Sequence, residues 1–261
     1  MKNEKPLGHK SYGSIPHLPH SRAGEKDFMA NSGQVLIATQ KARDKNDIII
    51  VQEKLDGSNC AVAKIGGDVV ALGRAGFRAE TSPYEQHRLF AWWVETQRER
   101  FSALLDEGER IVGEWMAQAH GTHYNLTSEP FIVFDLMRGH ERTPYKEFLN
   151  RVAGSLLPIP REIHFGDPIS VEDVLSRLEP SGHGAVELTE GAVWRVERLI
   201  PTGKKGEKKH IVDYLVKYVR PEKVDGCLLP EKTGGEAVWN WYPKQGDGWE
   251  VSRYYKQQIA V

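Results

Sequence analysis

The chain has 261 residues, 39% of them hydrophobic and 27% charged, which is typical of a globular protein with a sizeable core. Its net charge of −1 argues against indiscriminate coating of nucleic acid, although a balanced total still permits a local basic groove. No apolar run reaches the roughly 18 to 20 residues of a membrane span and no secretory signal opens the sequence, so we expect a cytoplasmic protein without membrane contact. Cys60 and Cys227 are too far apart for a CxxC zinc motif and are expected to be reduced thiols.

The N-terminal part of the sequence predicts an arm followed by a run of strands. Residues 1–33 are rich in Pro, Gly, Ser and His, which predicts an extended arm. The segment 35–39 is predicted to be a first strand. Three further strands are predicted in β-branched segments, the last two joined by a Gly-Gly hairpin turn, at 48–53, 60–65 and 68–74.

A long amphipathic helix is predicted over 82–108, with Ser82 as N-cap, Glu85 three residues later and a stopping glycine at Gly108. Short strands and helices follow, separated by a Pro-rich link at 157–166. The strands are predicted at 110–116 and 131–137, and the helices at 145–156 and 170–178.

Two strands, 191–200 and 212–219, are predicted to pair across a lysine-rich loop. The order of elements predicts an α+β fold of antiparallel sheets flanked by helices. We expect three parts, which are the arm at 1–33, a main domain at 34–220 and a short C-terminal extension at 221–261.

Lys54 lies in the sequence EKLDGSN, where a KxDG motif alone is weak evidence, because a strand end with a solvated lysine and an Asp-Gly turn explains it equally well. Other polar residues have similar ordinary interpretations. Phe134 fits a core strand, Glu114 and Glu190 fit exposed turns, and Arg74 fits a surface ion pair. Their joint order along the chain makes the pattern informative.

That order resembles the covalent nucleotidyltransferase superfamily of ATP-dependent ligases and RNA capping enzymes. Its members carry KxDG, a later Glu after Gly, an aromatic-Asp segment, EGxV and a lysine-bearing strand. The closer resemblance is to the RNA ligase 2 and RNA-editing ligase group, in which the nucleophilic lysine follows Glu and precedes Asn by five residues and Arg by twenty. The matching residues are Glu53, Lys54, Asn59, Arg74, Glu114, Phe134, Glu190 and Lys217.

The resemblance covers about 53–220 and, through SYGSIPHLPHSR, extends weakly upstream. It implies an ATP-grasp-like adenylation domain in which Lys54 takes AMP from ATP, with Mg²⁺ or Mn²⁺ as the metal. It also implies nucleotide contacts by Glu53, by Phe134 through stacking on adenine, by Glu114 at the ribose and by Asn59 and Arg74 near the α-phosphate. By the same resemblance Glu190 faces the metal and Lys217 the phosphates.

An ordinary lysine, with a pKa of ~10.4, is almost entirely protonated at neutral pH and cannot attack phosphorus. Asp56, two residues after Lys54, favours the charged form and raises this pKa further. We therefore expect a bound metal ion, a cationic neighbour such as Lys217, or partial burial to offset it.

The last strand departs from the family pattern, which has two lysines at alternate positions. Leu215 and Val219 stand at the positions alternate to Lys217, so Arg220 or Lys223 is a candidate for the missing charge. Only 44 residues follow Lys217, too few for an appended OB-fold. This favours an RNA ligase, acting on RNA ends or nicks including RNA/DNA hybrids, over a DNA ligase or a capping enzyme. A non-catalytic binding module with the same fold is the other alternative.

The loop GKKGEKKH carries four lysines that fit either a solvated hairpin or a docking site for RNA phosphates, and we expect it to emerge beside Glu190. These lysines are Lys204, Lys205, Lys208 and Lys209. His120 and His123 have HxxH spacing but no third ligand in context, which favours a structural or substrate-facing role over a zinc site.

Overall fold

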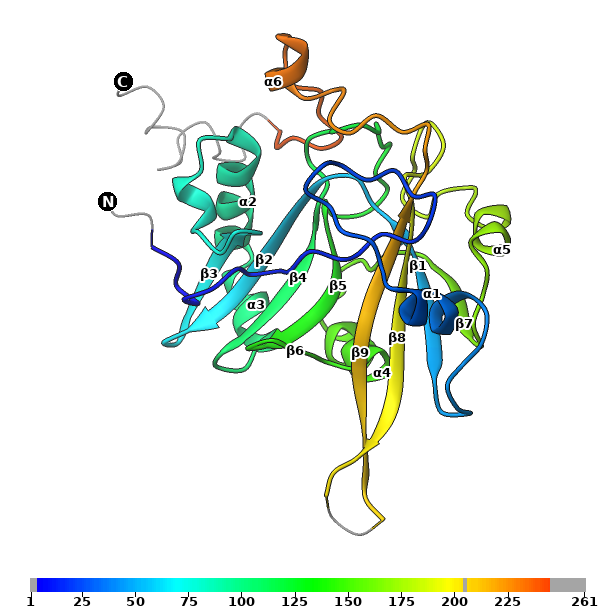
Figure 1. The fold of residues 1–261 in the computed structure, drawn as a ribbon. Coiled ribbons are helices and arrows are strands. Elements are labelled where there is room, and N and C mark those ends of the chain that lie inside the picture. The colour runs from blue at the N-terminus through cyan, green and yellow to red at the C-terminus, as the bar shows by residue number, and fades with distance from the viewer. Residues whose placement is uncertain (1–3, 204–205, 245–261) are drawn as a thin grey trace.

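Two antiparallel sheets form the framework of the molecule (Figure 1). The computed structural model describes residues 4–203 and 206–244. One sheet has the strand order β7-β1-β8-β9 and the other β3-β2-β4-β5-β6. The strands are β1 Ile48–Lys54, β2 Ser58–Ile65, β3 Asp68–Gly73, β4 Glu109–Trp115, β5 Phe131–Arg138, β6 Glu141–Arg142, β7 Glu162–Gly166, β8 Gly191–Pro201 and β9 Lys208–Val219.

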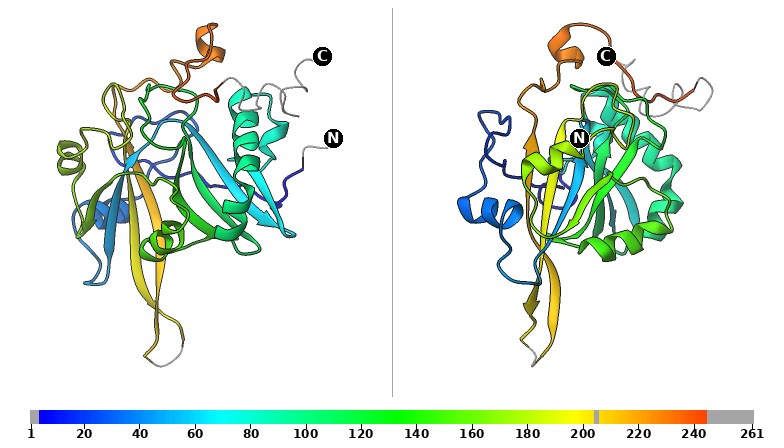
Figure 2. Two further views of the ribbon diagram at one scale, coloured as in Figure 1. Left: turned by 180° about the vertical axis from the view of Figure 1, so that it is seen from behind. Right: turned by 90° about the vertical axis from the view of Figure 1, so that its right-hand side faces the viewer.

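The helices lie outside these sheets. The arm and α1 lie on one side of the molecule, and α2, α3 and α4 on the other (Figure 2). Among the described residues, no helix combines the length and the apolar character that a membrane crossing requires. The helices are α1 Ser32–Thr39, η1 Ala79–Thr81, α2 Glu85–Thr96, α3 Arg98–Leu104, α4 Tyr145–Ala153, α5 Val171–Ser176 and α6 Pro230–Thr233. The predicted α+β fold of antiparallel sheets flanked by helices is confirmed.

Strand alternation divides the core between the two sides of the sheets. Ile49 and Val51 of β1 join the cluster beneath α1 and α5, whereas Ile50 joins the cluster beneath α2, α3 and α4. Successive strand side chains point to opposite faces, so β1 connects both clusters. Its last residue is Lys54, which is therefore held by a strand buried on both faces.

The predicted strand at 35–39 is wrong, because this segment belongs to helix α1. Asn31 accepts a hydrogen bond from the Gln34 backbone, and the Gln34 side chain accepts one from the Asn31 backbone, which forms a capping box. A short apolar run does not distinguish strand from helix by periodicity, and the preceding Asn-x-x-Gln was the signal that decides it.

The single helix predicted over 82–108 is also wrong in its extent. The chain forms α2 and α3, which meet at Gln97, and α3 ends at Leu104. Ser82 does not cap α2; its hydroxyl accepts a hydrogen bond from the Tyr84 backbone and contacts His87 instead. The Pro-rich link contains one strand that the sequence pattern missed, β7, which pairs with β1.

The arm is fixed across both sheets. The Leu18 amide donates to the carbonyl of Lys217 on β9, at 2.8 Å. The Tyr12 hydroxyl donates to the buried carboxylate of Asp135 on β5, at 2.6 Å. Asp135 also pairs with Arg142 and with the buried Arg195 of β8, so one carboxylate connects the arm to both sheets.

Tyr12→Phe should destabilise the protein by about 2 kcal/mol, because it removes a buried hydrogen bond to a charged group without removing the ring. Urea unfolding followed by tryptophan fluorescence measures this change. Tyr84→Phe is the matched control, since that side chain is 46% exposed at the start of α2. Equal free energies of unfolding for the two variants would contradict the assigned role of Tyr12.

Candidate active site

Strand register brings Lys54 next to Glu190. Lys54 ends β1 opposite Gly191, the first residue of β8, and its Nζ lies 2.5 Å from Glu190 Oε2. The turn after Lys54 depends on Gly57, because a Cβ there would lie 2.6 Å from the Trp115 carbonyl oxygen. A side chain at this position would push the turn, and Lys54 with it, away from β4.

The other sheet and β9 supply the remaining polar groups. Asn59 of β2 pairs with Glu114 of β4, and Lys217 of β9 pairs with Val193 of β8. All three polar side chains line the same space as Lys54. Residues more than 150 positions apart therefore meet through the order of the strands.

Two connected chambers meet at Lys54. The smaller measures about 160 Å³ and the larger about 690 Å³. Both are lined by the same five polar residues, which are Lys54, Asn59, Arg74, Glu114 and Lys217. The smaller chamber is completed mainly by ring, aliphatic and amide groups, whereas the larger one opens among arginines, histidines and carboxylates.

Phe134 reaches the small chamber because of a β-bulge. Val112 pairs with Asp135 and Gly113 pairs with Val133, so Phe134 is an extra residue outside the ladder. A bulge of this kind re-aims a side chain beside a site. The ring of Phe134 meets Tyr12 edge-on at 5.5 Å between centroids and is only partly buried.

Glu53 lines the small chamber but its carboxylate is already engaged. It accepts hydrogen bonds from the Ser181 hydroxyl at 2.5 Å and from the Gly182 amide at 2.8 Å. Burial raises the pKa of Glu53, although these two donors oppose the shift. The residue thus ties the loop before β8 to β1.

Two polar groups are available to a ligand. Asn59 Oδ1 is buried and has no hydrogen-bond partner among the described residues. Arg74 donates at 3.0 Å to the hydroxyl of Ser14 in the arm and remains exposed at the junction of the chambers. A buried amide oxygen without a partner is costly, so it indicates a place where a bound molecule completes the site.

The electrostatics of the site favour a protonated Lys54 when no ligand is bound. Burial lowers the pKa of Lys54, but Glu190, Glu114 and Asp56 together outweigh it and leave the pKa above its ordinary value. The expectation that burial or Lys217 offsets the acidic neighbours is therefore wrong for the ligand-free protein. Burial in turn raises the pKa of Glu114 and of Glu190 to about 7, against the opposing charge of Lys54.

The crowded carboxylates fit a divalent cation that is shared with a substrate. Among the described residues, no group of three or more His, Cys, Asp or Glu side chains could hold a metal alone. Mg²⁺ normally uses one or two carboxylates together with phosphate oxygens and water. Glu190, with Glu114 nearby, supplies that kind of donor set, and its pKa is raised mainly by burial and further by the charge of Asp56, both of which a cation would offset.

The structure does not place Arg220 or Lys223 where a second lysine of β9 would stand. Leu215 and Val219 face the small and the large chamber, respectively. Arg220 instead forms an ion pair with Glu179, which does not line the chambers. The Lys223 amine donates a hydrogen bond to the Thr122 hydroxyl. Both candidates for the missing charge are therefore wrong.

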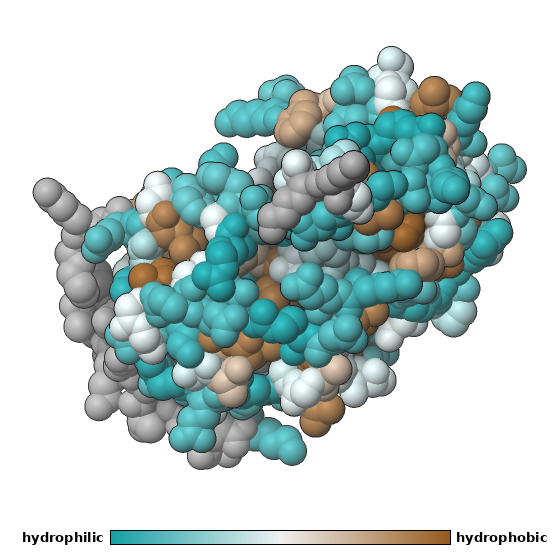
Figure 3. Space-filling model, turned by 90° about the horizontal axis from the view of Figure 1, so that it is seen from below, coloured by the Kyte–Doolittle hydropathy of each residue, from teal (hydrophilic) through white to brown (hydrophobic). Residues whose placement is uncertain are grey.

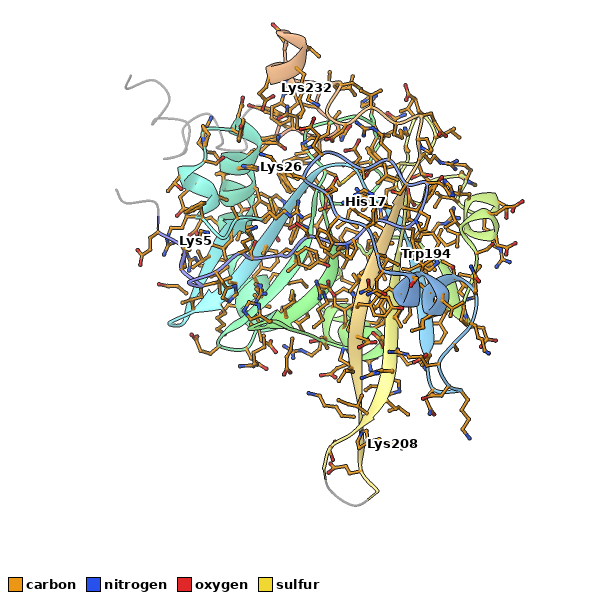
Figure 4. All side chains as sticks on the ribbon, viewed as in Figure 1. Lys5, His17, Lys26, Trp194, Lys208 and Lys232 are labelled. Carbon is orange, nitrogen blue, oxygen red and sulfur yellow. The ribbon has the colours of Figure 1, made fainter. Side chains whose placement is uncertain are left out.

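The lysine-rich loop lies far from Glu190, contrary to expectation. Glu190 precedes the first residue of β8, whereas Lys208 pairs with Pro201 at its other end. Ten steps of about 3.3 Å separate these ends by about 33 Å. Figure 4 shows Lys208 near the hairpin tip and His17 near the opposite end of β9. Lys204 and Lys205 lie outside the described residues, and Lys209 forms an exposed ion pair with a carboxylate of β6.

Several residues that line the chambers were not singled out from residue patterns, and four of them lie close to the motif residues or on the arm. These four are Tyr12, His17, Arg22 and Arg195. The first three belong to the arm, where SYGSIPHLPHSR was the available signal. Arg195 alternates with apolar residues in β8, a pattern that does not distinguish a buried arginine from an exposed one.

The raised pKa of Glu114 predicts how stability depends on pH. The folded protein keeps this carboxyl protonated up to about pH 7, while the unfolded chain releases the proton above about 4.5. The folded state thus binds more protons between these values, and stability falls as pH rises through them. Glu114→Gln should make this decline shallower by up to about 1.4 kcal/mol per pH unit, measured by urea unfolding from pH 5 to 8.

Glu107→Gln is the control for this measurement. Hydrogen bonds from the Gly67 and Gly66 amides lower the pKa of Glu107, so its titration ends below the tested range. The control should leave the slope between pH 5 and 8 unchanged. A Glu114→Gln slope parallel to that of the unmodified protein would show that this carboxyl ionises normally.

A Naegleria gruberi RNA ligase mutant solved with AMP and Mn is similar to this chain, with 17% identity and a TM-score of 0.50 over 70% of this chain and 52% of that one. A second mutant, solved with ATP and Mn, has 15% identity and a TM-score of 0.50 over 81% and 61%. An archaeal ATP-dependent RNA ligase has 18% identity and a TM-score of 0.43 over 80% and 48%. The chain spans about half the length of these solved structures.

No curated protein matches the chain. The likeness to the Naegleria structures concerns the fold, which has the two antiparallel sheets of an RNA ligase adenylation domain. The model of the RNA ligase family matches residues 47–219, which include β1 to β9. This segment is two thirds of the sequence, and the chain therefore belongs to the RNA ligase family.

Proposed function

We propose that the protein joins RNA ends with ATP through a lysyl-AMP intermediate on Lys54. The observation that carries this proposal is the position of Lys54 Nζ where an aromatic-lined chamber of about 160 Å³ meets a polar chamber of about 690 Å³. The small chamber suits a nucleobase and the large one suits phosphates and strand ends. A lysine between them can accept AMP from one side and pass it to the other.

The reaction has three balanced steps. The free amine of Lys54 attacks the α-phosphorus of ATP, a P–N bond forms, and pyrophosphate leaves. The 5′-phosphate of an RNA end then takes AMP from the lysine, which regains its amine. In the last step the 3′-hydroxyl oxygen attacks that 5′-phosphate, a phosphodiester bond forms, and AMP leaves.

Individual roles follow from the chamber that each residue lines. Phe134 stacks on adenine, Glu114 accepts a hydrogen bond from the ribose, and Asn59 and Arg74 hold the α-phosphate. Lys217 faces the phosphates, and burial lowers its pKa, with Lys54 adding to the shift. Glu53 supports nucleotide binding indirectly, because its hydrogen bonds to Ser181 and Gly182 fix the wall of the small chamber.

Glu190 has two roles in this proposal. In the ligand-free protein it keeps Lys54 protonated through the 2.5 Å ion pair. Glu190 would hold Mg²⁺ or Mn²⁺, which would supply positive charge beside the phosphates and compensate this carboxylate. With Glu190 compensated, burial of Lys54 would favour its free amine. Nucleotide binding and lysine activation are coupled in this way.

We assign the chain to the RNA ligase 2 and RNA-editing ligase group, with an arm at 1–33, an adenylyltransferase domain at 34–220 and an extension at 221–261. The described part of the extension, up to residue 244, contains only the short helix α6. Trp239 and Trp241 pack on the main core, which favours a supporting role over base stacking. Nicks, single-stranded ends and RNA/DNA hybrids are the substrates to compare.

Incubation with labelled ATP and Mg²⁺ should label the protein covalently, and Lys54→Ala should abolish the label because Lys54 Nζ is the nitrogen that takes AMP in this proposal. A denaturing gel measures it. Lys146→Ala is the control, since this lysine of α4 lies over the ring of Phe165 on β7, outside both chambers. Absence of label on the unmodified protein favours a non-catalytic binding module, and label from GTP favours a capping enzyme.

We also propose that the tip of the β8–β9 hairpin contacts RNA phosphates distant from the reacting ends. The face from which this hairpin projects is mostly hydrophilic (Figure 3). Lys208 and Lys209 are exposed there. These two lysines would contact RNA phosphates about the length of β8 away from the reacting ends, and would not act on the reacting phosphate.

The variant Lys208→Glu/Lys209→Glu should bind nicked RNA more weakly, and log K should depend less steeply on log salt, by about 0.9 per lost phosphate contact on a duplex. Lysyl-AMP formation should be unchanged. Filter binding at several salt concentrations measures the first effect. Lys5→Glu/Lys10→Glu carries the same charge change on the arm, away from the hairpin, and equal losses in both double variants would exclude a specific role of the hairpin.

A further inference from the structure

One wall of the large chamber is a hydrogen-bonded cluster that the roles above leave unused. It consists of Ser58 on β2, Gln86 and His87 on α2, and His120 after β4, all of which are buried or half-buried. Ser58, His87 and His120 line the chamber together with Lys54. The charge of Lys54 also acts on His120, so the cluster is close to the reacting region.

The hydrogen bonds determine which atom of this cluster is free. Ser58 donates to Gln86 Oε1 at 2.8 Å, and His120 Nε2 lies 3.0 Å from the same oxygen. With the Gln86 amide in this orientation its oxygen accepts from both groups, so His120 Nε2 carries the proton and Nδ1 the lone pair. Among the described residues, no group forms a hydrogen bond with His120 Nδ1. His87 differs, because Ser82 and Ser58 occupy both of its nitrogens.

The cluster is suited to a neutral donor and not to a phosphate. Burial lowers the pKa of His87, to about 4, and also lowers the pKa of His120, so both rings are neutral near pH 7. The ionisable groups that act on His120 from neighbouring segments are mostly acidic; they are Asp56, Asp225, Glu231, His87 and Lys54. An anion would be repelled there, whereas a hydroxyl can donate to the free nitrogen.

We propose that His120 Nδ1 receives the 3′-hydroxyl of the acceptor strand, with Gln86 and Ser58 holding the ring in place. This inference rests on the proposed function. When the 3′-oxygen attacks the adenylylated 5′-phosphate, its proton passes to Nδ1, the new P–O bond forms, and the P–O bond to AMP breaks. Arg74 and Arg78, in the same chamber, remain for the phosphates.

The test separates the last step from the first. Wild-type protein and three variants are given chemically adenylylated RNA and an acceptor strand in single turnover, and lysyl-AMP formation is measured in parallel. His120→Asn keeps an acceptor near the position of Nδ1, while His120→Gln keeps only a group near Nε2, and His120→Ala keeps neither. Joining should fall about 100-fold or more in the Ala and Gln variants.

His120→Asn should join at least about tenfold faster than His120→Gln, and all three variants should form lysyl-AMP at near wild-type rates. Equal joining by the Asn and Gln variants, or wild-type joining by the Ala variant, overturns the inference. Loss of lysyl-AMP in all three variants also overturns it, because His120 would then serve the fold. Failure of the proposed function looks different, since the wild-type protein itself would form no lysyl-AMP.

Discussion

The ion pair between Lys54 and Glu190 is the constraint on which the rest of the site depends. It joins the end of β1 to the start of β8 and leaves the amine protonated in the ligand-free protein. Two further carboxylates, Glu114 and Asp56, strengthen this state. Burying several carboxyl groups beside one amine is unfavourable by itself, and a cation at this position would compensate it.

The arm is part of the site and not an appendage to it. It contributes Tyr12 to the small chamber and His17 and Arg22 to the large one, and its backbone pairs with Lys217. The backbone amide of Arg22 donates a hydrogen bond to the carbonyl of Val219. Val219 is one of the two positions alternate to Lys217 at which a second lysine is missing. The arm therefore brings positive charge to a place where β9 presents an aliphatic side chain.

The sequence allowed the fold class, most strands and the residues around Lys54 to be predicted, because alternation and Gly-containing turns are local signals. It did not predict α1, since the short segment 35–39, with four apolar residues and a threonine, fits the period of a strand as well as that of a helix. The expectation that the lysine-rich loop lies beside Glu190 was wrong, because the whole length of β8 separates the two. The His120 cluster forms because α2 contacts β2 through the hydrogen bond between Gln86 and Ser58. The HxxH spacing of His120 and His123 gives no sign of this tertiary contact.

The bulge at Phe134 also affects how this position can change by mutation. Because this residue lies outside the β4–β5 ladder, its neighbours Val133 and Asp135 keep their partners whatever side chain it carries. A mutation in a regular strand position would have to satisfy both the sheet and the ligand. Phe134 is freed from the first requirement, so if it stacks on adenine as proposed, a substitution there leaves the β4–β5 ladder intact.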